Sequence, residues 1–313
     1  MKKASIDIAV LLLFFARPEQ TSKVFEQIKI ARPSKLFLYQ DGPRLNRPDD
    51  IKGIKECREI VENIDWECEV YRWYQEKNVG CDPSEYLSQK WMFEHVDKGI
   101  ILEDDDVPSQ SFFPFCKELL DKYENDSRIC MISGMNHMGQ VNIDADYFFC
   151  RKQGPIWGWA TWKRFVDMWD PQYRFLESKE SIKLLEKNGD LTEKRLASYY
   201  KHKETGKEHY EDFVSSTRIF NSMLAIIPSK NLISNIGISS ISTHSVDNLT
   251  MLPPKIRKLY YQPTYEYKFP LKHPEYVINN ITLSKEIDKS MFYGPKEKFF
   301  LLKRRFVKLF NIR

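Results

Sequence analysis

The chain of 313 residues has no apolar segment long enough to span a bilayer. A spanning helix needs about 20 apolar residues, whereas the longest apolar run, Ile8–Ala16, has nine and is bounded by Asp7 and Arg17. Two lysines precede this run as they would in a signal peptide. However, Asp7 interrupts the approach, and Arg17-Pro18 stands where a small-residue cleavage site would be. The run is therefore expected to form a buried β-strand.

Glycine, cysteine and histidine are also scarce, at 12, 6 and 6 residues. So little glycine excludes collagen-like and glycine-repeat architectures. The cysteines form no CxxC pair and have no histidine at zinc-finger spacing, so they indicate reduced thiols of a cytosolic protein that mostly fill the core. Aromatic residues reach 14%, which favours a folded chain over a disordered one.

The net charge of +4 is concentrated at one end of the chain. Residues 296–313 contain seven Lys or Arg and one Glu, a local charge of +6, so the rest of the chain carries a net −2. A nucleic-acid-binding protein usually carries its basic charge in the folded body. Nucleic acid is therefore not expected as a partner.

Apolar runs and segments of helical periodicity alternate along the first 150 residues. Strands are predicted at residues 6–16, 35–39, 67–73, 99–102 and 129–133, and helices at 19–31, 51–64, 84–96 and 112–123. This alternation is typical of βαβ units, so the predicted fold class is α/β with a mostly parallel central sheet flanked by helices. A tryptophan-rich segment, a charged helical stretch (176–208) and a tail rich in Pro and Tyr (253–295) follow.

Four consecutive acidic residues, Glu103 to Asp106, follow the fourth predicted strand. In open α/β sheets, ligands bind at the carboxyl ends of strands. Like charges this close repel one another unless a cation neutralises them, and hard oxygen ligands suit Mg²⁺ or Mn²⁺. A solvated acidic turn is the alternative, but the apolar strand before the acids and the aromatic helix after them favour a metal site.

An ordered set of motifs extends beyond the acids. The segments are FARP at 15–18, YQDGPR at 39–44, NVGC at 78–81, ICMISGMN at 129–136 and WGWATW at 157–162. With residues 100–115, this set resembles nucleotide-sugar transferases of the GT-A fold. It is similar above all to bacterial family 2-like glycosyltransferases, some labelled hemolytic protein HlpA-like, and more weakly to N-acetylglucosaminyltransferase I.

The resemblance covers residues 6–250 and implies a domain organisation. Residues 1–150 would form the nucleotide-sugar-binding part of a Rossmann-like GT-A domain. Residues 151–250 would form its acceptor-binding and catalytic part, the acceptor-side extension. An extended tail (251–295) and a C-terminal amphipathic helix (296–313) would follow.

For the acidic run, the resemblance implies separate roles. Asp105 matches the family's direct metal ligand. Asp106 is the alternative, because this chain carries one acid more than the usual motif. Glu103 and Asp104 would contact ribose, sugar or water.

Two further residues are expected on the donor side. Arg17 would pair with the diphosphate, since a guanidinium can bind phosphate oxygens bidentately. Asp41 could accept a hydrogen bond from the N3–H of uracil, although an Asx turn before Gly42-Pro43 needs the same residue type.

On the acceptor side, Asp212 matches the catalytic base of inverting family members, with Glu211 as the near alternative. Both would also suit the first turn of a helix, where acids complement the helix dipole. Trp157 and Trp159 would form part of an acceptor wall, although most tryptophan clusters belong to a core. His244 matches a late motif that approaches the diphosphate or the metal, with a structural hydrogen bond as the alternative.

The implied activity is inverting, metal-dependent transfer of a sugar from a nucleoside diphosphate, expected to be UDP, to a hydroxyl of a glycan or lipid-linked acceptor in bacterial surface polysaccharide synthesis. Two other classes stay open. A metal-dependent phosphodiesterase or nuclease would also gather acids at strand ends but would need more His or acidic ligands. A non-catalytic carbohydrate-binding or membrane-perturbing protein would need no base beside them.

The basic C-terminal segment shows helical periodicity, with apolar residues on one face and most basic residues opposite. Such a helix can lie in the interface of an anionic bilayer or dock its apolar face on the protein's own core. Because bacterial sugar transferases often extend lipid-linked glycans, we expect the first. The protein would then be cytoplasmic and peripheral on the inner face of the plasma membrane.

Overall fold

A computed structural model of the whole chain describes residues 1–238 and 252–291. His244 and the basic segment 296–313 therefore lie outside the described residues, and their expected roles stay predictions. In the described part of the chain, no helix combines the length and the apolar character needed to cross a bilayer.

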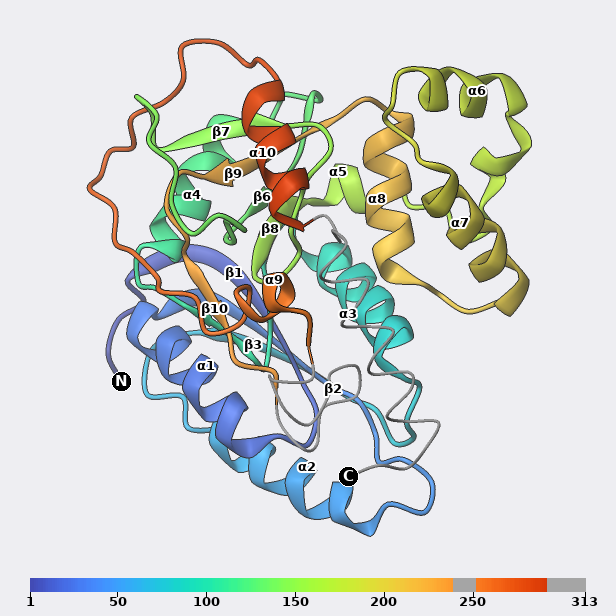
Figure 1. Cartoon of the computed structure of the whole chain (residues 1–313). Coiled ribbons are helices and arrows are strands. Elements are labelled where there is room, and N and C mark those ends of the chain that lie inside the picture. Colours follow the sequence, from blue (N-terminus) through green and yellow to red (C-terminus); the bar gives the residue numbers. More distant parts are fainter. Residues whose placement is uncertain (239–251, 292–313) are drawn as a thin grey trace.

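An eight-stranded sheet forms the centre of the protein (Figure 1). Its strand order is β3-β2-β1-β4-β8-β6-β9-β7, and the first four strands are parallel to one another. Strand β8 runs antiparallel to both of its neighbours, and β7 runs antiparallel to β9. The strands are β1 (Ile6–Phe14), β2 (Pro33–Gln40), β3 (Glu69–Tyr74), β4 (Lys98–Glu103), β6 (Ile129–Ser133), β7 (Tyr147–Cys150), β8 (Trp159–Trp162) and β9 (Leu224–Pro228).

Helices cover both faces of this sheet, which explains why β1 is apolar along nearly its whole length. Val10, Leu12 and Phe14 point to the face covered by α1 (Pro18–Ala31), α2 (Pro48–Val61) and α4 (Phe112–Lys122). Leu11 and Leu13 point to the other face, covered by α3 (Cys81–His95), α5 (Lys163–Val166) and α8 (Tyr210–Phe220). Successive side chains alternate between the faces because a strand has a period of two. The α/β prediction is confirmed, with a Rossmann-like, mostly parallel sheet.

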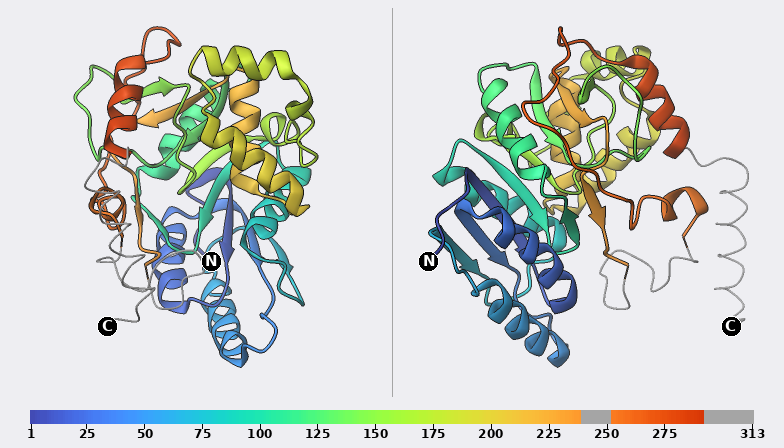
Figure 2. Two further views of the ribbon diagram at one scale, coloured as in Figure 1. Left: turned by 45° about the vertical axis from the view of Figure 1, so that its right-hand side comes forward. Right: turned by 90° about the vertical axis from the view of Figure 1, so that its left-hand side faces the viewer.

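The charged stretch at 176–208 forms two helices, α6 (Lys179–Lys187) and α7 (Glu193–Thr205). They are separated by Gly189, and the side chain of Thr192 caps α7 by accepting from the backbone N–H of Arg195 at 3.3 Å. Gly206 ends α7 in the left-handed conformation. Both helices lie with α8 at the end of the molecule away from α1 and α2 (Figures 1 and 2).

The described tail residues lie against the sheet domain. Two short helices, α9 (Pro254–Arg257) and α10 (Ile281–Met291), are separated by a long segment with little regular structure. Glu266 in that segment accepts backbone hydrogen bonds from Gln110 (3.2 Å) and Ser111 (2.7 Å) just before α4. The tail is thus tied to the loop that follows the acidic run.

Candidate active site

The carboxyl ends of β1 and β4 meet where the strand order reverses. The chain moves outward from β1 to β2 and β3, then returns to place β4 on the other side of β1. Such a switch point is the usual ligand site of an open α/β sheet. Here it brings Arg17, three residues after β1, to the acidic run that ends β4.

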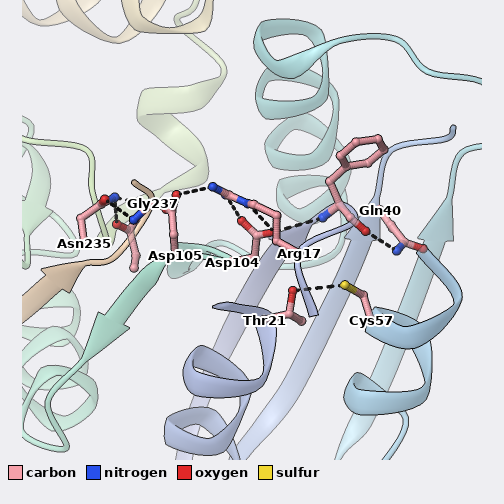
Figure 3. Close-up of polar contacts among 10 residues, drawn as sticks. Arg17, Thr21, Gln40, Cys57, Asp104, Asp105, Asn235 and Gly237 are labelled. Atoms are coloured by element: carbon pink, nitrogen blue, oxygen red, sulfur yellow. Dashed lines mark hydrogen bonds and ion pairs between the residues drawn. The ribbon is translucent and has the colours of Figure 1, made fainter. Parts of the chain in front are cut away.

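Arg17 binds two of the acids at once (Figure 3). Its Nη2 donates to Oδ1 of Asp104, and its Nε donates to Oδ2 of the same residue over 3.3 Å. Its Nη1 lies 2.8 Å from Oδ2 of Asp105. All three side chains are mostly buried, with 16%, 4% and 10% of their surface exposed. Burial alone would lower the pKa of Arg17, but the charges of Asp104 and Asp105 raise it overall.

More negative charge is gathered here than Arg17 offsets. Glu85, from the first turns of α3, lies beside Glu103 of the acidic run. Asp105 and Asp106 of the same run add two more carboxyl groups nearby. Burial away from water raises the pKa of each of these four acids, and each also lies near another acid that raises it further. The site therefore favours any partner that brings positive charge or protons.

A short two-stranded sheet fixes the end of the acidic run. Strand β10 (Ile233–Asn235) pairs antiparallel with β5 (Asp106–Pro108), and Asn235 lies opposite Asp106. The amide of Asn235 donates to Asp105 (3.1 Å) and Asp106 (3.0 Å). A Cβ on Gly237 would lie 2.1 Å from Oδ2 of Asp105, so only glycine lets the backbone pass this close.

The donor atoms here suit a divalent cation. Carboxylate oxygens are hard ligands, and Oδ2 of Asp106 is buried without a hydrogen-bond partner. Across the described ranges, no group of three or more His, Cys, Asp or Glu side chains is arranged to hold a metal. The acidic run thus offers one or two carboxylate ligands of the kind that Mg²⁺ takes in proteins, and the described residues form no all-protein cage.

A first cavity of about 100 Å³ adjoins Arg17 and contains Asp41. Oδ1 of Asp41 accepts from the N–H groups of Gly42 (2.8 Å) and Val79 (2.9 Å), and Oδ2 accepts from Asn78 Nδ2 (2.7 Å) and Gly80 N–H (3.0 Å). A carboxylate has about four lone-pair positions, so these bonds use them all. Asp41 ties the loop after β2 to the segment before α3, and its contact with a base stays a prediction.

A second cavity, of about 510 Å³, joins the acidic run to the start of α8. Arg17, Glu103 and Asp105 line one part of it, and Glu211 and Asp212 another. The structure thus brings the predicted metal ligand and the predicted base to one space. Glu211 is exposed and Asp212 is buried.

Asp212 is held by two side chains from different elements. Its Oδ2 accepts from the hydroxyl of Tyr173 at 3.2 Å and lies 2.7 Å from Nδ1 of His202 in α7. Oδ1 of Asp212 accepts no hydrogen bond from any described residue. His202 also stacks on His209, with ring centroids 3.9 Å apart. With Nδ1 of His202 donating to the carboxylate, its Nε2 is the nitrogen able to accept a proton.

The two tryptophans predicted for the acceptor wall lie in different surroundings. Trp157 lines the second cavity, and its ring centroid lies 5.0 Å from that of Tyr260. Trp159 is fully buried in β8, within the core under α8, and lines none of the cavities described here. The structure therefore brings Trp157 to the site and leaves Trp159 apart from it.

Three contributors were missed by the sequence reasoning: Glu85, His202 and Asn235. Glu85 stands in the first turns of a helix, where acids are common for the helix dipole alone. His202 lies in a charged helical stretch without a motif. The arrangement of α7 beside α8 brings His202 to Asp212, ten residues away in the sequence, and no local pattern signals this contact.

Comparison with known proteins adds little to this geometry. No protein-family model matches the chain, and no curated protein matches it. Among solved structures, 4-diphosphocytidyl-2C-methyl-D-erythritol synthase from Anaerococcus prevotii matches with 10% identity and a TM-score of 0.30, over 55% of this chain and 78% of that one.

Proposed function

We propose that this protein transfers a sugar from a nucleoside diphosphate, UDP in the first instance, to a hydroxyl of a glycan or lipid-linked acceptor. The observation that carries the proposal is the second cavity, which Asp105 and Asp212 line together. A metal-dependent phosphodiesterase would need more ligands around the acids, and the described residues offer no such group. In a binding protein the histidine-held carboxylate would only accept hydrogen bonds from sugar hydroxyls, so such a protein would bind a UDP-sugar without turning it over.

On the donor side, the switch point would hold the nucleotide. The first cavity would take part of the nucleoside. The guanidinium of Arg17 would turn from Asp104 toward the diphosphate and bind its oxygens. Asp105 and Asp106 are the residues that would hold a divalent cation. When bound, Mn²⁺ or Mg²⁺ supplies positive charge that stabilises the diphosphate as a leaving group.

On the acceptor side, Asp212 would act as general base. Its Oδ1 would take the proton from the attacking hydroxyl while His202 and Tyr173 hold the carboxylate by Oδ2. The oxygen would then attack the anomeric carbon from the face opposite the departing diphosphate, and the configuration would invert. A positioned base contributes about 10²–10⁴-fold to the rate. Trp157 offers an aromatic face for the acceptor.

A thermal-shift assay with the full chain tests the donor site. We expect a UDP-sugar with Mn²⁺ to raise the melting temperature by roughly 5 °C at a hundredfold excess over Kd, because only the native state binds it. Chelator should remove the effect. Asp105→Asn should lose both the shift and UDP release, whereas the exposed control Asp144→Asn should keep both.

Two results would reject the proposal. One is full activity of Asp105→Asn, or of the native chain in excess chelator. The other is hydrolysis of phosphodiesters without any sugar donor, which supports the phosphodiesterase alternative. Attachment to the inner membrane through residues 296–313 stays a separate prediction, because that segment lies outside the described residues.

A further inference from the structure

A third cavity of about 370 Å³ lies beside the second one and carries a different set of charges. It is formed by the segment between β7 and β8, by α7 and α8, and by a loop after β6. The two cavities share Ile156, Trp157 and Glu211. A molecule held by Trp157 at the second cavity can therefore extend into the third.

One face of α8 forms the floor of this third cavity. Glu211, Val214, Ser215 and Arg218 line it, at the i, i+3, i+4 and i+7 positions that share a helix face. From Glu211 to Arg218 the helix rises about 10 Å. The floor thus runs from Glu211, the neighbour of the proposed base Asp212, to the buried guanidinium of Arg218 two turns away.

Positive charge dominates the lining. Lys152, Arg195 and Arg218 contribute three cations, and Glu211 is the one acid among the described lining residues. The nearby Arg151 is paired with Asp190 at 3.0 Å. In the described part of the chain, none of the three lining cations has a carboxylate partner. Their charge is therefore available to a ligand.

Two buried polar atoms of the lining residues have no hydrogen-bond partner: Nε of Arg218 and Nδ1 of His137. Arg218 is only 5% exposed, and its other nitrogens donate to backbone carbonyls of Arg151 (2.5 Å), Gln153 (3.0 Å) and Lys152 (3.2 Å). Buried polar groups are nearly always satisfied, so unsatisfied ones call for an explanation. An oxyanion, which accepts hydrogen bonds only, matches the positive charge and the unpaired N–H of Arg218, and it matches Nδ1 of His137 in the tautomer that carries the proton there.

We propose that the third cavity binds an oxyanion, a carboxylate or a phosphoryl group, carried by the acceptor of the sugar transfer. That the bound molecule is the sugar acceptor rests on the proposed function, whereas the anion site rests on the cavity and its charges alone. The acceptor would place its attacking hydroxyl near Asp212, lie along Trp157, and anchor its charged group between Arg195, Lys152 and Arg218. The proposed acceptor is therefore a glycan that carries an acidic sugar or a phosphate group.

Binding of small probes to the full chain, followed by NMR, tests the anion site. We would use methyl β-D-glucuronide, glucose 1-phosphate and the neutral methyl β-D-glucoside. At low salt the two charged probes should bind and the neutral one should bind at least roughly tenfold more weakly, in keeping with charge-assisted hydrogen bonds. The stronger of the two charged probes identifies a carboxylate or a phosphoryl group as the natural anchor.

Exposed side chains allow the site to be altered without disturbing the core. Arg195→Gln and Lys152→Gln should each weaken the charged probes by roughly tenfold and leave the glucoside unchanged. Lys194→Gln is the matched control, since it removes the same charge from the neighbouring position of α7 but does not line the cavity. Added salt should weaken probe binding in the native chain.

Equal affinity for glucuronide and glucoside, or equal effects of Arg195→Gln and Lys194→Gln, would overturn the anion site. If those results came with intact UDP-sugar transfer to a neutral acceptor, the proposed function would stand without it. If the charged probes bind as expected but no nucleotide sugar binds or turns over, the anion site holds and the sugar-transfer function fails.

Discussion

Removing the guanidinium of Arg17 is the sharpest test of how the site is held together. In Arg17→Met, Asp104 and Asp105 keep their buried positions but lose the cation that binds both. Breaking a buried ion pair by deleting one partner typically costs about 3–5 kcal/mol, because a charge remains buried without compensation. For a chain of this size that corresponds to a drop of roughly 6–10 °C in melting temperature.

The loss should depend on pH in a defined direction. Burial already raises the pKa of Asp105, and Arg17 opposes that rise by stabilising the charged carboxylate. Without Arg17 the folded-state pKa of Asp105 therefore rises further above its unfolded value. The folded variant then binds more protons than the unfolded chain, and its stability falls as pH increases. The deficit relative to the native chain should therefore be largest near pH 8 and shrink toward pH 4.5.

Thermal unfolding of the metal-free chain at several pH values measures this. Arg72→Met is the control: it removes an exposed ion pair with Glu62 and should cost at most about 1 kcal/mol. A drop of less than 2 °C for Arg17→Met, or a deficit that grows as pH falls, would refute the account of Arg17 as the buried counter-ion of the acidic run.

Three further predictions concern the carboxylates and their partners. Asp212→Asn should keep UDP-sugar binding and lower kcat by about 10²–10⁴-fold. If Asp212→Asn keeps its activity and Glu211→Gln loses it, the base is Glu211 instead. His202→Gln should lower kcat by less than Asp212→Asn does, because the histidine holds the carboxylate of Asp212 rather than reacting itself; an unchanged kcat would leave His202 a structural role only. Burial raises the pKa of Glu85, so Glu85→Gln should stabilise the metal-free chain at pH 8 by at least ~1.4 kcal/mol, the free energy of one pKa unit, with the gain vanishing near pH 4.5. No gain in the melting temperature of Glu85→Gln at pH 8 would contradict that.

Much of the fold was accessible from local pattern. The apolar run at residues 6–16 and the alternation of strands and helices to residue 133 predicted a buried, mostly parallel sheet. The structure has this sheet, with β1 ending at Phe14. The antiparallel insertion of β8 between β4 and β6 was not accessible. The sequence pattern of a four-residue strand is too short to predict which strands it pairs with. Its position depends on which strand edges the rest of the sheet leaves unpaired.

For the site, the sequence by itself determined which residues end which strands. Arg17 after β1 and the acids after β4 had to share one edge once the strands were parallel, because parallel strands carry their carboxyl ends to the same side. Only the tertiary structure decided the partners that have no local signal. It put Asn235 on Asp105 and Asp106, His202 on Asp212, and Arg218 in a cavity with His137. These contacts join residues from separate elements, and packing of the whole chain, rather than any local pattern, brings them within reach.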